Sequence, residues 1–439
     1  MSLLNPDYRS GADYAFLVSR LPPDIQRMHA MGIRNVTLIG FDPTSCVYFW
    51  RSIADLAMQK TPAELMGQTA TARQLRFYKW IVRGRNDADM GMQLTGHGGT
   101  DAARQAASLL PGEEKRGCGH CGWAPAQKEV YSYCAGCVIE SQGRRISCMY
   151  YCSRKCQEDH WPTHKTFCTT RKKVVRAAHL IQKLMYAIEA AGAQRQVESL
   201  EVRDGVTHLH EVPQEELVLR GGPILNPVAQ GNASQEAYHA ALTGQTCNEI
   251  VIVGRQLLNL LIDPYCRHME VITIVPRNAV NPLGILNASS KLNKECYMMI
   301  GAHKVIRLHL ASGETLLLDI SGAQYGWREP VAPWDKWCRH RAAHVNHANA
   351  VHVSDTIENK QRMLASYEQI RGERLRRQMA QRIQSLLSTE AAQRKLPSVL
   401  ALLGLPGISY NVFEQHVVQA AQQACLQISQ SGRTSRRGL

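Results

Sequence analysis

The chain has 439 residues, of which 44% are hydrophobic and 20% are charged. These values are typical of a folded protein with two or three domains, and they exclude a disordered or fibrous chain. The formal net charge of +14 is compatible with acidic partners or nucleic acid, but no long lysine/arginine block concentrates it.

Neither of two common targeting segments is recognisable in the sequence. No run of about 18 apolar residues predicts a membrane span, and the first residues lack the charged start and apolar run of a secretory signal. We therefore expect a cytoplasmic or nuclear protein that makes no membrane contact. In such a reducing compartment the fourteen cysteines are expected to bind metal or to stay as thiols, and not to form disulfides.

Residues 1–110 are predicted to form a mostly helical region without a recognisable motif. Apolar side chains recur at helical spacing over residues 46–59 and 63–82, whereas residues 34–41 form a short apolar run typical of a buried strand. Glycine and polar residues at 83–100 indicate a turn-rich linker. We assign this region no function.

Eight cysteine and histidine residues within segment 112–170 are spaced as zinc ligands. They form four pairs: Cys118 and Cys121, Cys134 and Cys137, Cys152 and Cys156, His164 and Cys168. Pairs separated by two or three residues suit one tetrahedral Zn²⁺, because a tight turn or one helical face directs both side chains to the same point. Eight ligands make two closed sites, which predicts a structural role for zinc with no position left for a reactive water.

The second half of this segment resembles a MYND finger. It reads Tyr-Cys-Ser-Arg-Lys-Cys-Gln at 151–157, then His-Trp-Pro-Thr-His-Lys at 160–165, then Cys168. The first half departs from the family pattern, because fourteen residues separate Cys137 from Cys152. The resemblance implies a cross-braced finger: Cys118, Cys121, Cys152 and Cys156 hold one zinc ion, and Cys134, Cys137, His164 and Cys168 hold the other.

Three other cysteine or histidine residues lie close to this ligand set in the sequence. Cys148 lies in the long spacing and is an alternative ligand, although the Tyr-Cys and Cys-Gln dipeptides favour the pair given above. His160 lies on the same helical face as His164, but the family pattern places the ligand at His164. His120 lies inside the first pair and is expected to be exposed.

The resemblance also implies a kind of partner. MYND fingers bind short proline-rich peptides of other proteins in a shallow groove, and Gln157 and Trp161 match the positions of groove contacts. A tryptophan ring can stack on proline, and a glutamine amide can bond to peptide backbone. An equally favoured alternative is that Trp161 packs in the small core of the finger.

The remaining chain is predicted to contain three further parts. Residues 171–235 form an amphipathic helix over 171–191 and then a polar linker, and residues 236–350 form a mixed α+β domain. Residues 351–439 form charged helices that end in a disordered tail. We interpret the densest basic group as a solvated surface in preference to a nucleic-acid-binding stripe. This group consists of Arg371, Arg374, Arg376, Arg377 and Arg382.

The mixed domain contains a pattern of residues that is typical of catalysis. The sequence lacks the cofactor motif and the cysteine cluster of the SET methyltransferases, in which MYND fingers also occur. His303 begins a strand of a hairpin predicted at 303–310 and 315–320, and Asp319 lies on the second strand. This order is similar to that of transglutaminase-like and papain-like enzymes, in which aspartate orients histidine and histidine activates a cysteine. Cys247, at the start of a helix predicted over 248–262, is the candidate nucleophile.

The register of the hairpin decides whether these side chains can meet. With a three-residue loop, Asp319 shares its face of the sheet with His303 and His309, whereas with a two-residue loop His303 points away. A hairpin that contains the histidine and the aspartate by chance remains the other interpretation.

We thus predict a multidomain, mainly α protein with a small α+β C-terminal domain and an embedded two-zinc finger. The favoured function is a zinc-binding adaptor or regulatory protein that recruits its partner through the finger. The alternative is a cysteine-dependent acyl or amide transferase or hydrolase that uses Cys247, His303 and Asp319, with the finger as targeting module. The run at 322–327, Gly-Ala-Gln-Tyr-Gly-Trp, resembles sequences beside MYND fingers in fungal proteins, which implies no particular activity.

Overall fold

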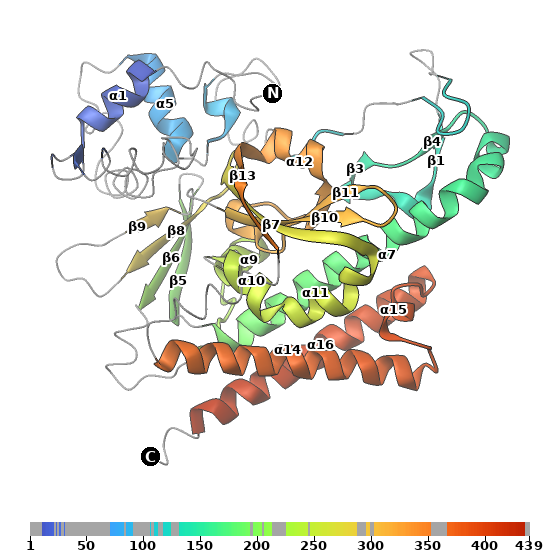
Figure 1. Cartoon of the computed structure of the whole chain (residues 1–439). Helices are drawn as coiled ribbons and strands as arrows, with labels where there is room; N and C mark the ends of the chain where they lie inside the picture. Colours follow the sequence, from blue (N-terminus) through green and yellow to red (C-terminus); the bar gives the residue numbers. More distant parts are fainter. Residues whose placement is uncertain are drawn as a thin grey trace.

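The computed structural model describes the chain in separate ranges (Figure 1). The described residues are 11–21, 23, 26–27, 30, 71–82, 85–90, 106, 109–112, 117–123, 131–193, 196–203, 206–212, 225–244, 246–287, 296–298, 303–352 and 367–434. The strand expected at 34–41 and the helix expected at 46–59 lie outside these ranges. The end of the C-terminal tail, residues 435–439, also lies outside them.

Two helices are described in the N-terminal region, α1 (Gly11–Ser19) and α5 (Ala72–Val82). α5 occupies the C-terminal half of the second helix predicted there. The segment expected to be a linker contains the short 3-10 helix η3 (Asp87–Met90) and is partly buried. Arg85 is fully buried and donates a hydrogen bond to the carbonyl of Pro276 at 3.1 Å. The segment therefore packs against the central sheet.

A five-stranded antiparallel sheet lies at the centre of the molecule, in the order β12-β11-β10-β7-β13. Its strands are β7 (Cys266–Pro276), β10 (His303–Leu310), β11 (Thr315–Leu318), β12 (Val331–Pro333) and β13 (Ala342–His352).

The β10-β11 hairpin has the register that the candidate catalytic residues require. His309 pairs with Thr315, and a three-residue loop at 311–313 follows from the hydrogen bond between Leu310 and Glu314. This loop lies one residue earlier than expected, but the parity of the pairing is the same. His303 is therefore on the face of the sheet toward which Asp319 is directed.

A second, four-stranded sheet has the order β5-β6-β8-β9, with β6 and β8 parallel. Its strands are β5 (Gln196–Arg203), β6 (Val206–Val212), β8 (Leu283–Asn287) and β9 (Cys296–Met298). The predicted polar linker is therefore wrong for residues 196–212. Leu209 packs with Leu283 and Ile285, so the apolar side of this segment is buried by a strand from a distant part of the chain.

One continuous helix, α7 (Arg154–Gly192), connects the cysteine region to the centre of the molecule (Figure 1). The hydroxyl of Ser153 caps it by accepting a hydrogen bond from the N–H of Cys156 at 3.1 Å. The amphipathic helix expected at 171–191 is the C-terminal half of α7. The boundary expected between residues 170 and 171 therefore falls inside a helix.

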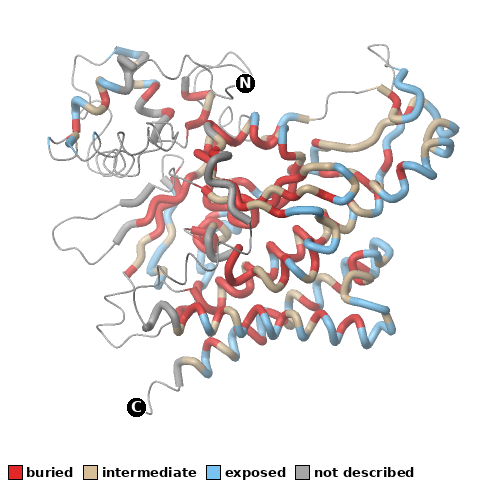
Figure 2. The backbone as a smooth tube through the Cα atoms, viewed as in Figure 1, coloured by how far each residue is buried: buried red, intermediate tan, exposed pale blue. Residues whose placement is uncertain are grey.

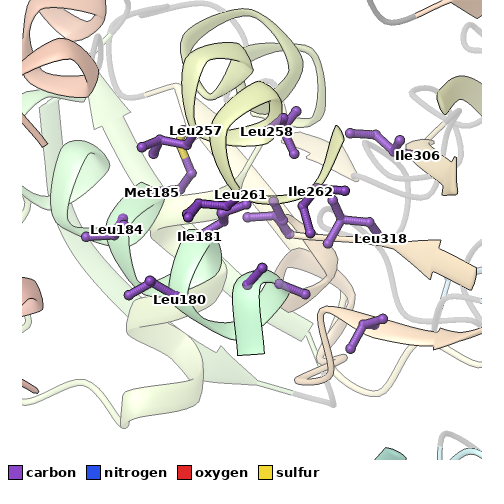
Figure 3. Packing of buried hydrophobic residues seen from close by; sticks show 14 of the residues in the cluster. Leu180, Ile181, Leu184, Met185, Leu257, Leu258, Leu261, Ile262, Ile306 and Leu318 are labelled. Atoms are coloured by element: carbon purple, nitrogen blue, oxygen red, sulfur yellow. The ribbon is translucent and has the colours of Figure 1, made fainter. Parts of the chain in front are cut away.

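The main hydrophobic core joins α7 to the central sheet (Figure 3). The residues labelled in that view are Leu180, Ile181, Leu184, Met185, Leu257, Leu258, Leu261, Ile262, Ile306 and Leu318. Two short helices, α10 (Cys247–Val253) and α11 (Arg255–Leu261), replace the single helix predicted over 248–262. Gly254 separates them.

The C-terminal helices are α14 (Tyr367–Gln393), α15 (Val399–Leu402) and α16 (Gly407–Thr434). α14 and α16 lie beside α7, with their buried residues turned inward and their exposed residues outward (Figure 2). Met379 and Phe413 contribute to the main core from these two helices.

The arginine group on α14 does not form one exposed stripe. Arg376 is 2% exposed and pairs with Glu189 of α7, which is also buried. Arg374 and Arg382 are exposed. The solvated surface preferred from the sequence describes Arg374 and Arg382, but it does not describe the buried Arg376.

The mainly α composition with several small sheets agrees with the mainly α part of the predicted fold class, while the predicted arrangement of domains stays a prediction. Among the helices in the described ranges, none is long and apolar enough to cross a membrane.

Candidate functional site

The first group of metal ligands consists of Cys118, Cys121, Cys152 and Cys156, whose sulfur atoms lie within 4.8 Å of one another. The sulfur of Cys152 is 3.7 Å from that of Cys121 and 3.5 Å from that of Cys156. Thiolates about 2.3 Å from a tetrahedral zinc ion are about 3.8 Å apart from one another. The separations therefore suit zinc, and they are too long for a disulfide.

The second group consists of Cys134, Cys137, His164 and Cys168, and all four are buried. The sulfur atoms of Cys134 and Cys168 are 3.6 Å apart. Nε2 of His164 is buried and has no hydrogen-bond partner. Such a nitrogen is costly to bury unless it binds something, so its environment fits a metal ligand.

Local structure explains how each pair is directed to one point. The 118–121 pair lies on a turn in which the N–H of Gly122 bonds to the carbonyl of Cys118 at 2.9 Å, and Gly122 has a φ of +74°. The 134–137 pair spans the 3-10 turn η4 (Ala135–Cys137). His164 and Cys168 are four residues apart on α7 and therefore share a face of the helix, and Cys156 lies in the first turn of α7.

The fourteen residues between Cys137 and Cys152 contain a hairpin formed by β2 (Ile139–Ser141) and β3 (Arg144–Ser147). After this inserted hairpin, β4 (Tyr150–Tyr151) pairs with β1 (Ser132–Tyr133). The pairing brings the third pair of ligands back beside the first, which makes the cross-bracing possible.

The three competing residues are not part of either ligand group. Nδ1 of His160 lies 3.1 Å from the hydroxyl of Tyr151, so this ring supports the finger by a hydrogen bond. His120 is exposed, as expected, and Cys148 is half-buried.

The family model of the MYND finger matches residues 118–168. Comparison with curated proteins and with solved structures gave no match for the chain. With the two ligand groups, the family match identifies this segment as a MYND finger for two zinc ions. Bound zinc supplies coordination bonds that hold the segments of the finger together, and the ligand sets are closed. MYND fingers are in general protein-interaction modules.

The two residues expected to contact a partner lie one turn apart on α7. The Trp161 side chain is 41% exposed, so it is not enclosed in the finger core, and Gln157 is half-buried. Two further aromatic residues, Trp123 and Tyr133, carry no motif that predicts binding, and they are 53% and 41% exposed. Exposed tryptophan and tyrosine side chains are frequent in binding surfaces.

Outside the finger, three residues expected to form a catalytic group lie together. Cys247 begins α10, His303 begins β10, and Asp319 directly follows β11. Nε2 of His303 is 3.0 Å from Oδ1 of Asp319, and both side chains are almost completely buried. The Cys247 thiol is half-buried and interacts with the same imidazole. His309 does not join them, because it lies 3.3 Å from Glu270 on the exposed part of the sheet.

The electrostatics of the three groups favour a thiolate–imidazolium pair. Burial by itself raises the pKa of the Cys247 thiol, but the nearby imidazole of His303 holds the pKa below its usual value through its positive charge. Burial lowers the pKa of His303, but the charge and hydrogen bond of Asp319 raise it to about 9. Activated cysteines commonly have such a shifted pair.

The loop after Asp319 encloses the histidine with aromatic rings. The ring of Tyr325 is 4.9 Å from that of His303, and the ring of Trp327 is 6.2 Å from it. A Cβ at Gly322 would lie 2.7 Å from Oδ2 of Asp319, so only glycine permits this close approach of carboxylate and backbone. These residues belong to the run at 322–327 that was noted in the sequence, but the run by itself did not predict that they contact His303 and Asp319.

The same loop forms one wall of a cavity of about 490 Å³. Trp327 separates the cavity from His303, and Tyr186 and Tyr238 contribute further aromatic lining. Burial and the nearby charge of Asp319 both raise the pKa of Tyr186, so this ring stays neutral. Cys247, His303 and Asp319 are not among the residues that line this cavity.

Proposed function

We propose that this chain is a cysteine-dependent acyl or amide transferase or hydrolase that recruits a protein through its MYND finger. The observation that carries the proposal is the convergence of Cys247, His303 and Asp319 from three separate segments. Structural ion pairs also perturb pKa values, so the proposal depends on the placement of the three groups and not on those shifts alone.

Each residue has a definite task in this reaction. The Cys247 thiolate attacks a carbonyl carbon, and the His303 imidazolium gives its proton to the departing amine or alcohol as the thioester forms. Water or a second amine then attacks the thioester, His303 takes up the proton, and the Cys247 thiolate leaves. Asp319 holds the ring in the required orientation throughout.

Acyl transfer from p-nitrophenyl acetate tests this proposal with the full-length, zinc-loaded chain. We expect a burst of nitrophenolate and an acetyl group on the Cys247 peptide in mass spectrometry. Cys247→Ala is expected to abolish both signals, and Asp319→Asn to slow the burst by about 100-fold or more.

Cys266→Ala is the matched control, because Cys266 is half-buried and burial raises its pKa to about 12. It is expected to react as the wild type does. Equal acetylation in the wild type and in Cys247→Ala would refute the enzymatic function.

A second proposal concerns the finger itself, which would bind a proline-rich peptide. The specific observation in its favour is the exposure of Trp161, one helical turn from Gln157. The tryptophan would stack on proline, and the amide would bond to the peptide backbone. In this function the finger would bring a substrate or regulatory protein to the chain.

Calorimetric titration with proline-rich peptides tests the peptide site. Trp161→Ala is expected to weaken binding by about 30-fold, which corresponds to a hot-spot residue. Thr163→Ala is the control, because Thr163 is exposed on another face of the same helix and donates only to the carbonyl of His160. Equal affinities for the wild type and Trp161→Ala would exclude the groove.

A further inference from the structure

The inserted hairpin of the finger, β2-β3, is built into the core of the central sheet. Ile139 and Ile146 are each 1% exposed and belong to the same hydrophobic cluster as β10 and β11. The finger is thus not attached through α7 alone.

A buried polar contact joins this hairpin to the loop beside the candidate catalytic group. The hydroxyl of Ser141, which is 1% exposed, donates a hydrogen bond to the carboxylate of Glu329. The other carboxylate oxygen of Glu329 accepts a hydrogen bond from Arg341 at 2.7 Å. The Glu329 and Arg341 side chains are 4% and 1% exposed, so neither charge can be solvated if this contact is broken.

Glu329 is linked directly to two residues that support the aspartate and the histidine. It precedes Pro330 in the chain, and it accepts a hydrogen bond from Arg341. The N–H of Asp319 donates to the carbonyl of Pro330, the next residue in the chain, at 2.8 Å. The guanidinium of Arg341 lies 5.1 Å from the ring centre of Trp327, and that ring packs beside His303. The hydroxyl of Ser141 is therefore connected to Asp319 through Glu329 and Pro330, and to His303 through Glu329, Arg341 and Trp327.

A second ion pair connects the finger to the far end of the same hairpin of the sheet. Arg171 donates to the carbonyl of the zinc ligand Cys137 at 2.9 Å, and it also forms a bidentate pair with Glu314. Glu314 lies at the turn between β10 and β11. Both ends of the hairpin that presents His303 are thus tied to the finger.

We propose that the inserted hairpin of the MYND finger positions the cysteine–histidine–aspartate group, so that zinc binding to the finger controls the reactivity of Cys247. Ser141 and Glu329 act as positioning residues, because they contact the supporting loop and none of the reacting atoms. The inference rests on the proposed function of Cys247 as an activated thiol. It gives the long spacing between Cys137 and Cys152 a role in the molecule.

The test is the pH profile of alkylation of Cys247 by iodoacetamide in the full-length chain, followed on its peptide by mass spectrometry. In the zinc-loaded wild type we expect a midpoint well below 8.5, the value of an ordinary cysteine. Ser141→Ala should retain both zinc ions by elemental analysis and shift the midpoint upward by about one unit. Alkylation below the midpoint then slows by about tenfold. Removing zinc from the wild type with a chelator should shift it in the same direction.

Two variants separate positioning from general damage. Ser141→Thr retains the hydroxyl and should restore the wild-type profile. Ser132→Ala is the matched control, because that serine lies in the finger and its hydroxyl donates to the carbonyl of Tyr151, which is also in the finger.

Unchanged midpoints in both Ser141→Ala and the chelated protein would overturn the coupling while leaving the activated thiol in place. A midpoint near 8.5 in the zinc-loaded wild type would instead refute the activated thiol, and with it the control of its reactivity by zinc.

Discussion

His303 combines burial with a charged partner, and this combination makes the stability of the protein depend on pH. Burial opposes its protonation, but Asp319 more than compensates and raises the pKa of the ring to about 9. A raised pKa in the folded state means that the folded protein binds a proton more tightly than the unfolded chain does. The imidazolium therefore stabilises the fold fully below about pH 6.5, the unfolded value, and this stabilisation is lost as the pH rises through about 9.

His303→Gln is expected to remove that pH dependence in a Cys247→Ala background, where no thiol titrates together with the ring. Between pH 6.5 and 9 the free energy of unfolding of Cys247→Ala should fall relative to that of the double variant Cys247→Ala with His303→Gln. The difference in pKa corresponds to about 3 kcal/mol at most. Urea unfolding at the two pH values measures this difference. A parallel change in both proteins would show that the ring is not protonated in the folded state.

At the scale of elements, the long helix α7 has two different environments along its length. Its first half holds three zinc ligands, and its second half is buried by α11, α14 and α16. The attachment of α14 includes a buried ion pair between Arg376 and Glu189. Burial lowers the pKa of Arg376 to about 10, so the guanidinium is still charged at neutral pH.

Arg376→Met is expected to lower the free energy of unfolding by about 3–5 kcal/mol, because Glu189 then stays buried as an unpaired charge. The double variant Arg376→Met with Glu189→Gln should recover part of that loss. Arg374→Met is the control, since Arg374 is exposed on the same helix and should change stability by no more than about 0.5 kcal/mol. Thermal or urea unfolding gives the comparison. Equal losses for the two single variants would contradict the role of the buried pair.

At the scale of the whole molecule, the finger depends on metal in a way that the rest of the chain does not. The finger has its own small cluster of buried residues, made largely of the cysteines themselves. Binding of a structural zinc ion contributes about 10–16 kcal/mol in isolated finger peptides, so folding and metal binding are one event there.

A strong chelator should therefore unfold residues 118–168 and leave residues 177–191 of α7 protected. In hydrogen–deuterium exchange we expect rapid exchange of the finger amides, including those of 154–168, after two zinc ions per chain are removed. The buried half of α7 should exchange as slowly as before, because the core holds it. Unchanged exchange in the finger after complete zinc removal would contradict this prediction.

The sequence alone determined the zinc finger and the identities of its eight ligands. Metal ligation depends on side-chain type and short spacing, and both are local properties that a single sequence displays. The sequence also indicated Cys247, His303 and Asp319 as candidates, but two loop lengths of opposite parity left open whether the histidine and the aspartate share a face. The strands β5 and β6 were not predicted from the sequence. Their apolar partners lie more than seventy residues later, and the polar residues of the edge strand β5 hide the alternation of apolar and polar residues.

Only the tertiary structure decided which residues meet. It paired His303 with Asp319 while His309 pairs with Glu270, and it directed the Cys137–Cys152 insertion onto the central sheet. The segment at Arg85, which was predicted to be a linker, is buried in the structure, and Arg376 forms an ion pair with Glu189. These contacts join residues separated by up to about two hundred positions. Their energy comes from burial and charge in the assembled core, which no local window of the sequence contains.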